Sequence, residues 1–364
     1  MPYGSVNADL MTTSDGVSSS GLYGFKNRLI NSAMVIDQRN AGASVTTSGA
    51  GYTLDRWSFY VAQASKLTIQ QSSTAPTGFV NSSLITSSSA YSVVASDQFE
   101  FRQFIEGYNT ADLMWGTANA QTVTLSFWVR SSLTGTFGGA IRNSASDRSY
   151  VFSYSISSAN TYEYKTITIA GDTSGTWLTT NGRGIGVFFS LGAGSTFLKT
   201  AGSWGAGEFS GATGQTNLVG TNGATFYITG VQLEKGSTAT SFDYRPYGTE
   251  LQLCQRYFEK SYDTSVAVGT ATGVGAISTV TYGVSTLRPF LAIQFQVAKR
   301  TSATVTSYTP NTANTSGKIG GPSGADLSAT IQNAGTQAFQ IYQSQVSSTS
   351  NGDYYIHWTS SAEL

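Results

Sequence analysis

Residues 224–257 constrain the fold more than any other stretch, because the spacing of their apolar residues changes along it. Over 225–233, aromatic and β-branched residues alternate with a period of two, which predicts a β-strand that stops near Glu234. An aromatic run without helical spacing follows, and Pro246 within it favours extended backbone. A strand that leads into an extended arm is expected at the end of a β-domain.

The arm is followed by the strongest helix signal in the chain. Thr249 and Gln252 have the spacing of a capping box, which satisfies backbone N–H groups at the start of a helix. Leu251, Cys254 and Phe258 recur at the spacing of one helical face. We therefore expect a short helix that links two β-modules, with Cys254 buried as a small apolar residue.

The composition favours an all-β protein of two domains. The 364 residues include 40 glycines, 20 tyrosines and 19 phenylalanines, and only 11% are charged. Twenty basic and twenty acidic residues cancel, so no long-range field attracts nucleic acid or an anionic membrane. The single cysteine excludes an intramolecular disulfide. Without an apolar run of membrane-spanning length or a signal peptide, synthesis in a cytoplasm and no membrane insertion are expected.

Period-two segments, separated at short intervals by turn residues, predict the antiparallel strands of a sandwich or barrel. In the segment 123–129 the odd positions are apolar and the even ones polar, except for Trp128. Apolar residues at 29–36 and 266–272 predict strands as well. The irregular, glycine-rich segment 192–223 is expected to cover one end or one face of the sandwich. The expected organisation is an N-terminal arm (1–24), a β-sandwich or barrel (25–246), a linking helix (247–262) and a smaller C-terminal β-sandwich (263–364).

Five landmarks carry a resemblance to a known family. They are NRLINSAMVIDQR at 27–39, YTLDRW at 52–57, TVTLSFWVR at 122–130, YEYKTITIAG at 162–171 and GVQLEKGSTATSFDYRPYGTELQLCQRYFE at 230–259. In this order they closely resemble segments of bacteriophage tail-fibre and appendage proteins that carry a jelly-roll domain of the carbohydrate-binding-module type. The resemblance spans 26–259. It implies that the domain 25–246 is a β-sandwich jelly roll, that the arm 1–24 attaches the chain, and that the protein is located in a virion and contacts the host or another virion component.

The resemblance also implies a homo-oligomer, most often a trimer, and we expect its axis near Leu251, Cys254 and Phe258. The arm 1–24 contains too few apolar residues to form a core, so it is expected either to lie against a neighbouring chain or virion protein or to pack along its own domain. The expected function is the presentation of adhesive surfaces to a host glycan or receptor. Two alternatives remain open, a capsid or neck protein that binds only virion proteins and a glycan depolymerase.

Residues suited to catalysis are sparse. The only histidine, His357, has no nearby serine-elbow motif, so a structural role is expected. A glycosidase needs two carboxylates beside a cleft, but no pair stands out in sequence. The candidates are Glu100, Glu106, Asp112, Asp147, Glu163, Asp172 and Glu208. We therefore expect no enzymatic activity and assign no catalytic residue.

No cofactor is expected, and no cluster of metal ligands occurs in the sequence. Jelly-roll carbohydrate-binding modules often hold a structural calcium ion, so the resemblance raises Asp37 and Asp243 as candidate ligands. The alternative is that both are ordinary turn or surface carboxylates.

The sequence offers better candidates for a glycan site. Aromatic rings stack on the C–H faces of sugars, while Asn, Arg and Glu side chains pair with hydroxyl groups. Trp177 and Trp204 lie in predicted loops, with Asn181, Arg183 and Glu208 near them in sequence. These five residues form the predicted ligand-binding set. A second interpretation is that the two tryptophans close one end of the sandwich or contact another subunit.

Overall fold

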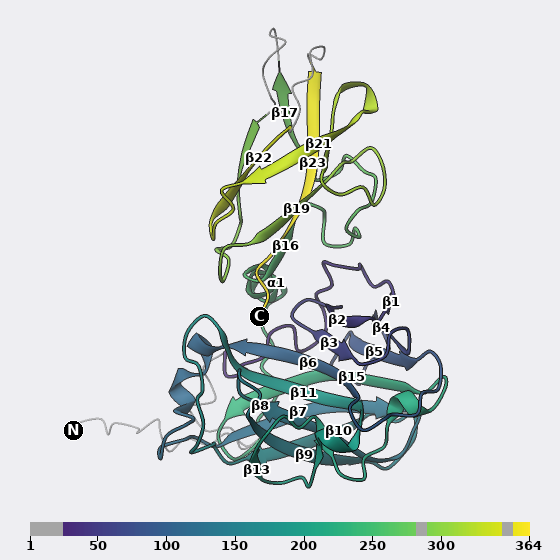
Figure 1. Ribbon diagram of the computed structural model, residues 1–364, viewed down its shortest axis with the longest axis vertical. Coiled ribbons are helices and arrows are strands. Elements are labelled where there is room, and N and C mark those ends of the chain that lie inside the picture. The colour runs from purple at the N-terminus through teal and green to yellow at the C-terminus, as the bar shows by residue number, and fades with distance from the viewer. Residues whose placement is uncertain (1–24, 282–289, 344–351) are drawn as a thin grey trace, which may run out of the picture. The chain divides into compact units, whose positions relative to one another are not determined.

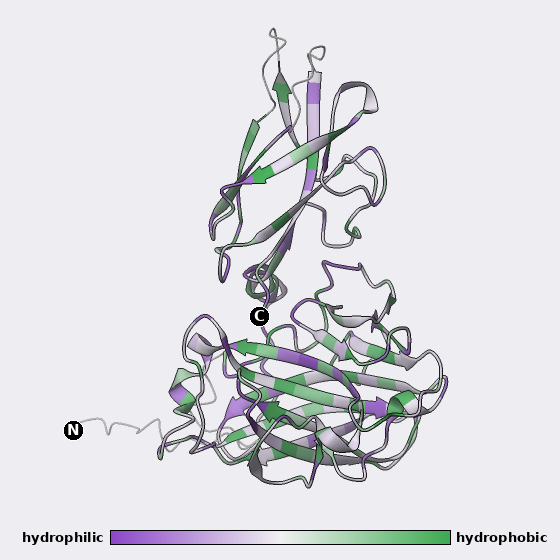
Figure 2. Ribbon diagram, in the orientation of Figure 1, coloured by the Kyte–Doolittle hydropathy of each residue, from purple (hydrophilic) through white to green (hydrophobic). Residues whose placement is uncertain are grey.

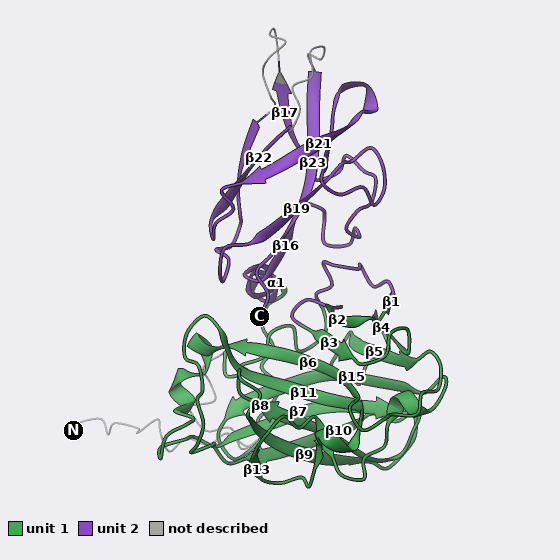
Figure 3. Ribbon diagram, in the orientation of Figure 1, with its two compact units in different colours: residues 1–35, 46–51, 57–247 green, residues 36–45, 52–56, 248–364 purple. Residues whose placement is uncertain are grey.

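The computed structural model describes residues 25–281, 290–343 and 352–364 (Figure 1), and the predicted arm 1–24 lies outside these residues. In this part of the chain α1 (Tyr247–Gln255) is the one α-helix, and the other regular elements are strands and short 3-10 turns. The predicted all-β fold is therefore confirmed. The chain divides into two compact units (Figure 3). The first comprises the described residues up to Val35 together with 46–51 and 57–247, and the second comprises 36–45, 52–56 and the described residues from Gly248 onward.

The first unit contains two large antiparallel sheets. The six-stranded sheet has the order β1 (Val45–Thr46), β4 (Leu67–Ser72), β5 (Ser82–Ser87), β15 (Thr225–Lys235), β7 (Val123–Ser131) and β10 (Glu163–Ile169). The seven-stranded sheet has the order β13 (Trp204–Ala206), β9 (Arg148–Ile156), β8 (Gly135–Arg142), β11 (Arg183–Ala193), β6 (Gln98–Glu106), β3 (Ser58–Val61) and β2 (Gly49–Tyr52). The short strands β12 (Leu198–Lys199) and β14 (Gly211–Ala212) form a parallel pair.

Alternating side chains from both sheets build the core of the first unit. Hydrophobic and hydrophilic residues alternate along several of its strands (Figure 2). Phe127 of β7 is fully buried, with its ring centroid 5.1 Å from that of Phe189 in β11 and 5.0 Å from that of Tyr154 in β9. Trp57 stacks on Phe101 with a centroid distance of 4.9 Å. Each such side chain contributes about 1.5–3 kcal/mol through burial, so the two sheets form a sandwich around a continuous aromatic core.

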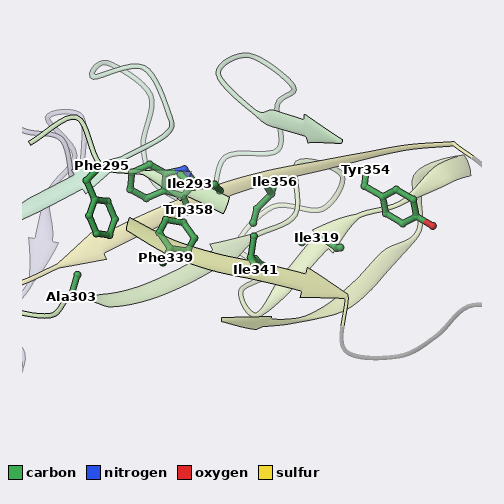
Figure 4. Packing of buried hydrophobic residues seen from close by; sticks show 9 residues of the cluster. All are labelled: Ile293, Phe295, Ala303, Ile319, Phe339, Ile341, Tyr354, Ile356 and Trp358. Atoms are coloured by element: carbon green, nitrogen blue, oxygen red, sulfur yellow. The ribbon is translucent and has the colours of Figure 1, made fainter. Parts of the chain in front are cut away.

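The second unit is a smaller β-structure organised around β23 (Gly352–Ser361). Its strands follow the order β16 (Phe258–Lys260), β23, β20 (Lys318–Gly320), β21 (Asp326–Gln332), β22 (Ala338–Gln343) and β18 (Phe290–Gln294), while β17 (Ile277–Thr281) and β19 (Thr304–Tyr308) also pair with β23. The buried cluster in Figure 4 consists of Ile293, Phe295, Ala303, Ile319, Phe339, Ile341, Tyr354, Ile356 and Trp358. Strand β23 supplies three of these residues and therefore connects the sheet to its core.

Several local predictions differ from the structure. The helical segment expected at 247–262 ends at Gln255, and Phe258 lies in β16, because the aromatic residues after the helix pair with β23. No strand forms at 29–36, where Asn31 and Met34 have left-handed backbone angles (φ 54° and 58°). The segment 266–272 also lacks a strand. No helix in the described ranges is long and apolar enough to span a membrane.

Candidate functional site

The outward face of the six-stranded sheet carries a row of aromatic side chains. In β7 the odd positions from Val123 to Val129 point into the core, so Trp128 and Arg130 point outward. The register places Tyr164 of β10 opposite Trp128 and Tyr227 of β15 opposite Arg130, so these side chains share the outward face. Because antiparallel partners lie side by side, three strands together present a continuous aromatic surface.

A groove of about 430 Å³ opens on this surface. Its lining residues are Phe79, Ser126, Trp128, Tyr164, Gly230, Ala239, Thr240, Ser241, Phe242 and Tyr244. Three strands, the turn that contains Phe79 and the arm after β15 therefore contribute to it. None of these residues carries an ionisable acid or base other than the tyrosine hydroxyl groups, so the groove is mainly aromatic and hydroxyl-lined.

An irregularity in β15 shapes the floor of the groove. The pairing of β15 with β7 shifts register between Thr229 and Gln232, and Gly230 within this bulge has a φ of 60°. A Cβ atom at Gly230 would lie 2.6 Å from the Phe79 ring and 3.1 Å from the Trp128 ring. Only glycine combines this backbone conformation with such close approach of two rings. The bulge therefore allows Phe79 and Trp128 to lie over the strand.

The aromatic rings meet at angles instead of forming one closed stack. Trp128 and Tyr164 have centroids 5.3 Å apart and planes tilted by 46°. Phe242 lies edge-on to Phe79 at 5.1 Å and to Tyr244 at 4.8 Å. Tyr164 is 43% exposed and Tyr244 is 58% exposed. The two tyrosines therefore leave ring surface accessible to a ligand.

Polar contacts hold the arm that forms one side of the groove. The backbone N–H of Thr240 donates to Oε1 of Glu234 at 2.9 Å, and the Thr240 hydroxyl donates to Oε2 at 2.6 Å. The Asp243 N–H donates to Gln232 Oε1 at 2.8 Å. The Tyr244 hydroxyl, whose pKa is raised by partial burial, donates to a turn carbonyl at 2.6 Å. These contacts fix the groove before a ligand arrives, which lowers the entropic cost of binding.

The tryptophans of the predicted ligand-binding set lie elsewhere in the first unit. Trp177 and Trp204 pack edge to face with each other at 5.4 Å, and with Trp115 at 4.7 and 5.3 Å respectively. The Nε1–H group of Trp177 donates to the Ser174 carbonyl at 3.1 Å, and that of Trp204 donates to the Ala170 carbonyl at 2.7 Å. The three tryptophans therefore pack against one another, and their loops are in contact there.

The other three residues of that set make separate interactions. Asn181 is exposed, and Arg183 begins β11 with its guanidinium 4.0 Å from the centroid of Phe104. Glu208 forms an ion pair with buried Arg142 at 2.6 Å. The structure thus brings Trp177 and Trp204 together, and the role of the whole set in binding stays a prediction.

Most of the candidate catalytic carboxylates are paired with basic side chains. Glu100, Asp112, Glu163, Asp172 and Glu208 form ion pairs with Arg or Lys. Asp147 accepts a hydrogen bond from Asn143 at 2.6 Å, and Glu106 is buried. An ion pair lowers the proton affinity of a carboxylate, as the lowered pKa of Glu163 beside Lys165 illustrates. Such groups are poorly suited to act as a general acid.

His357 is a fully buried residue of the second unit. Its ring stacks on Tyr262 at a centroid distance of 3.7 Å, its Nδ1 lies 3.0 Å from the Ser261 hydroxyl, and its Nε2 lies 2.9 Å from the Thr272 carbonyl. Since a carbonyl can only accept, the proton is assigned to Nε2. Burial lowers the pKa of His357, which keeps the ring neutral at pH 7. These contacts agree with the structural role expected for it.

The predicted calcium ligands and interface residues also have protein partners. Asp37 accepts hydrogen bonds from the backbone of Asn40 and Gly42, and Asp243 accepts one from the backbone of Asn27. In the described ranges no three His, Cys, Asp or Glu side chains gather as a metal site. Cys254 is fully buried, Phe258 is 6% exposed, and Leu251 lines a second pocket of about 400 Å³ in the second unit. Cys254 and Phe258 are therefore covered within one chain, and the oligomer interface stays a prediction.

The groove around Trp128 was not predicted, although one sequence signal points to it. Trp128 is the single aromatic residue on the otherwise polar face of its strand. The remaining rings come from a turn, an edge strand and the arm, and their convergence depends on strand order. The fold and the groove thus define an all-β protein with a sandwich unit that presents an open aromatic surface.

No family model and no curated protein matches the sequence. Among solved structures, the enzymatically active domain of bacteriophage CBA120 tailspike protein 4 is similar with a TM-score of 0.32 and 12% identity, over 58% of this chain and 22% of that chain. A family 11 carbohydrate-binding module from Clostridium thermocellum in complex with a β-1,3-1,4-mixed-linked tetrasaccharide has a TM-score of 0.27 and 12% identity, over 54% of this chain and 98% of the module. TmCBM61 in complex with β-1,4-galactotriose has a TM-score of 0.27 and 11% identity, over 50% and 88%. Similarity at this level identifies neither a ligand nor an activity for this chain.

Proposed function

We propose that the first unit binds carbohydrate in the groove around Trp128. The observation that carries this proposal is the set of partly exposed rings, Trp128, Tyr164 and Tyr244, held on a sheet and surrounded by hydroxyl groups. Sugar rings have apolar C–H faces that pack on aromatic rings and hydroxyl groups that need hydrogen-bonding partners. A groove with aromatic walls and few charges suits both requirements.

A glycan array tests this proposal with the full chain. Trp128→Ala removes the largest ring of the groove, and Tyr164→Ala removes an exposed ring whose loss disturbs packing less. Loss of a central aromatic anchor costs about 2 kcal/mol or more, so affinity should fall at least about thirtyfold. Tyr108→Ala removes a 63% exposed ring outside the groove and serves as the matched control. Glycan binding that survives both groove substitutions would refute the assignment.

We further propose that the chain is part of a phage virion appendage, a tail fibre or fibre tip, in which binding attaches the particle to the host surface. The support is the order of five sequence landmarks over 26–259, together with an adhesive groove on a rigid sandwich. In this proposal the arm 1–24 contacts other virion proteins and the chain is a homotrimer. Immunogold electron microscopy of particles would locate the chain, and labelling of the shell or neck would favour a decoration protein. Light scattering that gives a monomer would refute the trimer.

We propose that this function is binding without glycan cleavage. Five candidate carboxylates form ion pairs with Arg or Lys, and no acidic residue lines the groove. A retaining or inverting glycosidase needs two carboxylates beside the bound sugar. Mass spectrometry of host surface glycans after incubation with the chain should detect no new oligosaccharides. Their appearance would favour the depolymerase alternative.

A further inference from the structure

An arginine lies beside the aromatic groove, on the same face of the sheet as Trp128. Arg130 follows Trp128 by two residues on the same face of β7, so their Cα atoms are separated by about 7 Å, the repeat of an extended strand. Its guanidinium carbon lies 4.9 Å from the ring centroid of Tyr227 and 6.0 Å from that of Tyr162. Tyr227 lies in the neighbouring strand β15, and Tyr162 immediately precedes β10, the strand on the other side. The cation is therefore held in place by rings that continue the aromatic surface.

Arg130 differs in its polar partners from five other arginines of this unit. Arg28, Arg102, Arg142, Arg148 and Arg245 each lie within 4.0 Å of a carboxylate oxygen. In the described ranges Arg130 forms no ion pair, and its Nε is buried without a hydrogen-bond partner. A guanidinium has five N–H donors. The two tyrosine rings contact the guanidinium, but they do not replace a hydrogen-bond acceptor for these donors. The donors on its two terminal nitrogens remain available to a ligand.

The surroundings of Arg130 also leave its charge uncompensated. Glu163, the acid next to Tyr162 in sequence, pairs with Lys165 at 2.6 Å and accepts two backbone N–H groups. Glu234, further along β15, accepts hydrogen bonds from Gln232 and Thr240. These contacts direct both carboxylates to partners other than Arg130. Since Arg130 is half-buried, a ligand anion that reaches it would interact more strongly than in bulk water.

We propose that the groove selects an acidic glycan, with one sugar ring against Trp128 and Tyr164 and a uronic-acid carboxylate on Arg130. This inference rests on the proposed carbohydrate-binding function and names its substrate class. The planar guanidinium matches a carboxylate in a two-bond arrangement, which neutral sugars cannot reproduce. The spacing of about 7 Å between the two residues on the strand is suited to one sugar residue that contacts both.

The test uses the full chain and an array of uronic-acid oligosaccharides. Oligogalacturonate, hyaluronan and alginate fragments are each presented beside their methyl-esterified or carboxyl-reduced forms, together with neutral glycans. At least one acidic form should bind about tenfold to a hundredfold more tightly than its uncharged counterpart, as hydrogen bonds to charged groups lead us to expect. Raised salt should reduce this preference.

Substitutions separate the charge from the rest of the groove. Arg130→Gln should bind the acidic and uncharged forms with equal affinity, whereas Arg130→Lys should keep part of the preference because it retains the charge without the planar fork. Arg28→Gln is the matched control, since Arg28 already pairs with exposed Asp112. Circular dichroism of each variant confirms folding.

The outcomes distinguish this inference from the function on which it rests. If the wild-type chain binds glycans but does not prefer acidic forms, or if the preference survives Arg130→Gln, the inference is overturned and carbohydrate binding stands. If no glycan on the array binds in a manner that depends on Trp128, the proposed function fails and the inference fails with it.

Discussion

Asp55 offers a quantitative test of the second unit. It is fully buried, and its carboxylate accepts hydrogen bonds from the backbone N–H of Gln38 at 2.7 Å and from the Gln38 side-chain amide at 2.6 Å. Burial raises the pKa of Asp55 from 3.8 to about 6, because these bonds and the charge of Arg39 offset the desolvation only in part. The folded chain therefore holds the Asp55 proton more tightly than the unfolded chain does.

The sign of the pH effect follows from this difference. The contribution of Asp55 to stability is fully present below pH 3.8 and is lost as the pH rises through 6. A difference of about two pKa units corresponds to about 3 kcal/mol of lost stability at pH 7. Asp55→Asn cannot ionise and should remove this loss. Its amide matches the Gln38 donors less well, which costs about 1 kcal/mol, so a net gain of about 2 kcal/mol is expected at pH 7.

Hydrogen exchange of backbone amides in β23 measures the stability of the second unit within the full chain. The difference in free energy of unfolding between Asp55→Asn and wild type should grow from about zero or below at pH 4 to about 2 kcal/mol at pH 7. Asp353→Asn removes an exposed carboxylate of the same unit and serves as the matched control. If the difference in free energy of unfolding between Asp55→Asn and wild type stays constant over this pH range, the conclusion that burial raises the pKa of Asp55 is refuted.

Three further predictions concern the first unit. Gly230→Ala forces a left-handed backbone angle on a residue with a side chain and places a Cβ atom against Phe79, so denaturant unfolding should show a loss of at least about 1–2 kcal/mol, with weaker glycan binding. Trp115→Ala should lower the free energy of unfolding by about 3–5 kcal/mol while the remaining folded protein keeps its glycan affinity, because this buried ring lies outside the groove. Arg142→Ala should cost about 3–5 kcal/mol, because it leaves the buried Glu100 carboxylate without that cation, and limited proteolysis should then cleave the segment 194–217 faster.

The sequence predicted the strands better than the segments between them. The alternation over 225–233 and 123–129 specifies both the strand and its buried face, and β15 and β7 follow it closely. At 29–36 the apolar residues are buried without forming a strand, because left-handed residues turn the chain there. At 266–272 apolar and β-branched residues predicted a strand, but the folded chain has no strand there. Burial and strand formation are separate consequences of apolar character.

The binding surface could be predicted only in part. The sequence shows Trp128 as an aromatic residue on an otherwise polar strand face. Phe79 and Tyr244 join it only because the arm returns over the bulge in β15. Trp177 and Trp204 were expected to present ring faces from loops. In the structure each donates its N–H group to a carbonyl and packs on the edge of another ring, contacts that the linear spacing does not reveal, and their role in binding stays a prediction. Strand order and side-chain packing decide which aromatic residues reach solvent.

The two outward faces of the sandwich differ in a way that directs binding to one of them. Over the seven-stranded sheet lies the segment 194–217, where the Ser210 hydroxyl donates to Glu100 at 2.6 Å and Glu208 pairs with Arg142 at 2.6 Å. A sugar chain could reach that face only if the segment moved, and movement would break contacts to buried charged groups, at a cost of several kcal/mol. On the opposite face the rings around Trp128 pack against one another and leave the groove open. The folded chain therefore exposes its aromatic surface on the six-stranded sheet without having to rearrange.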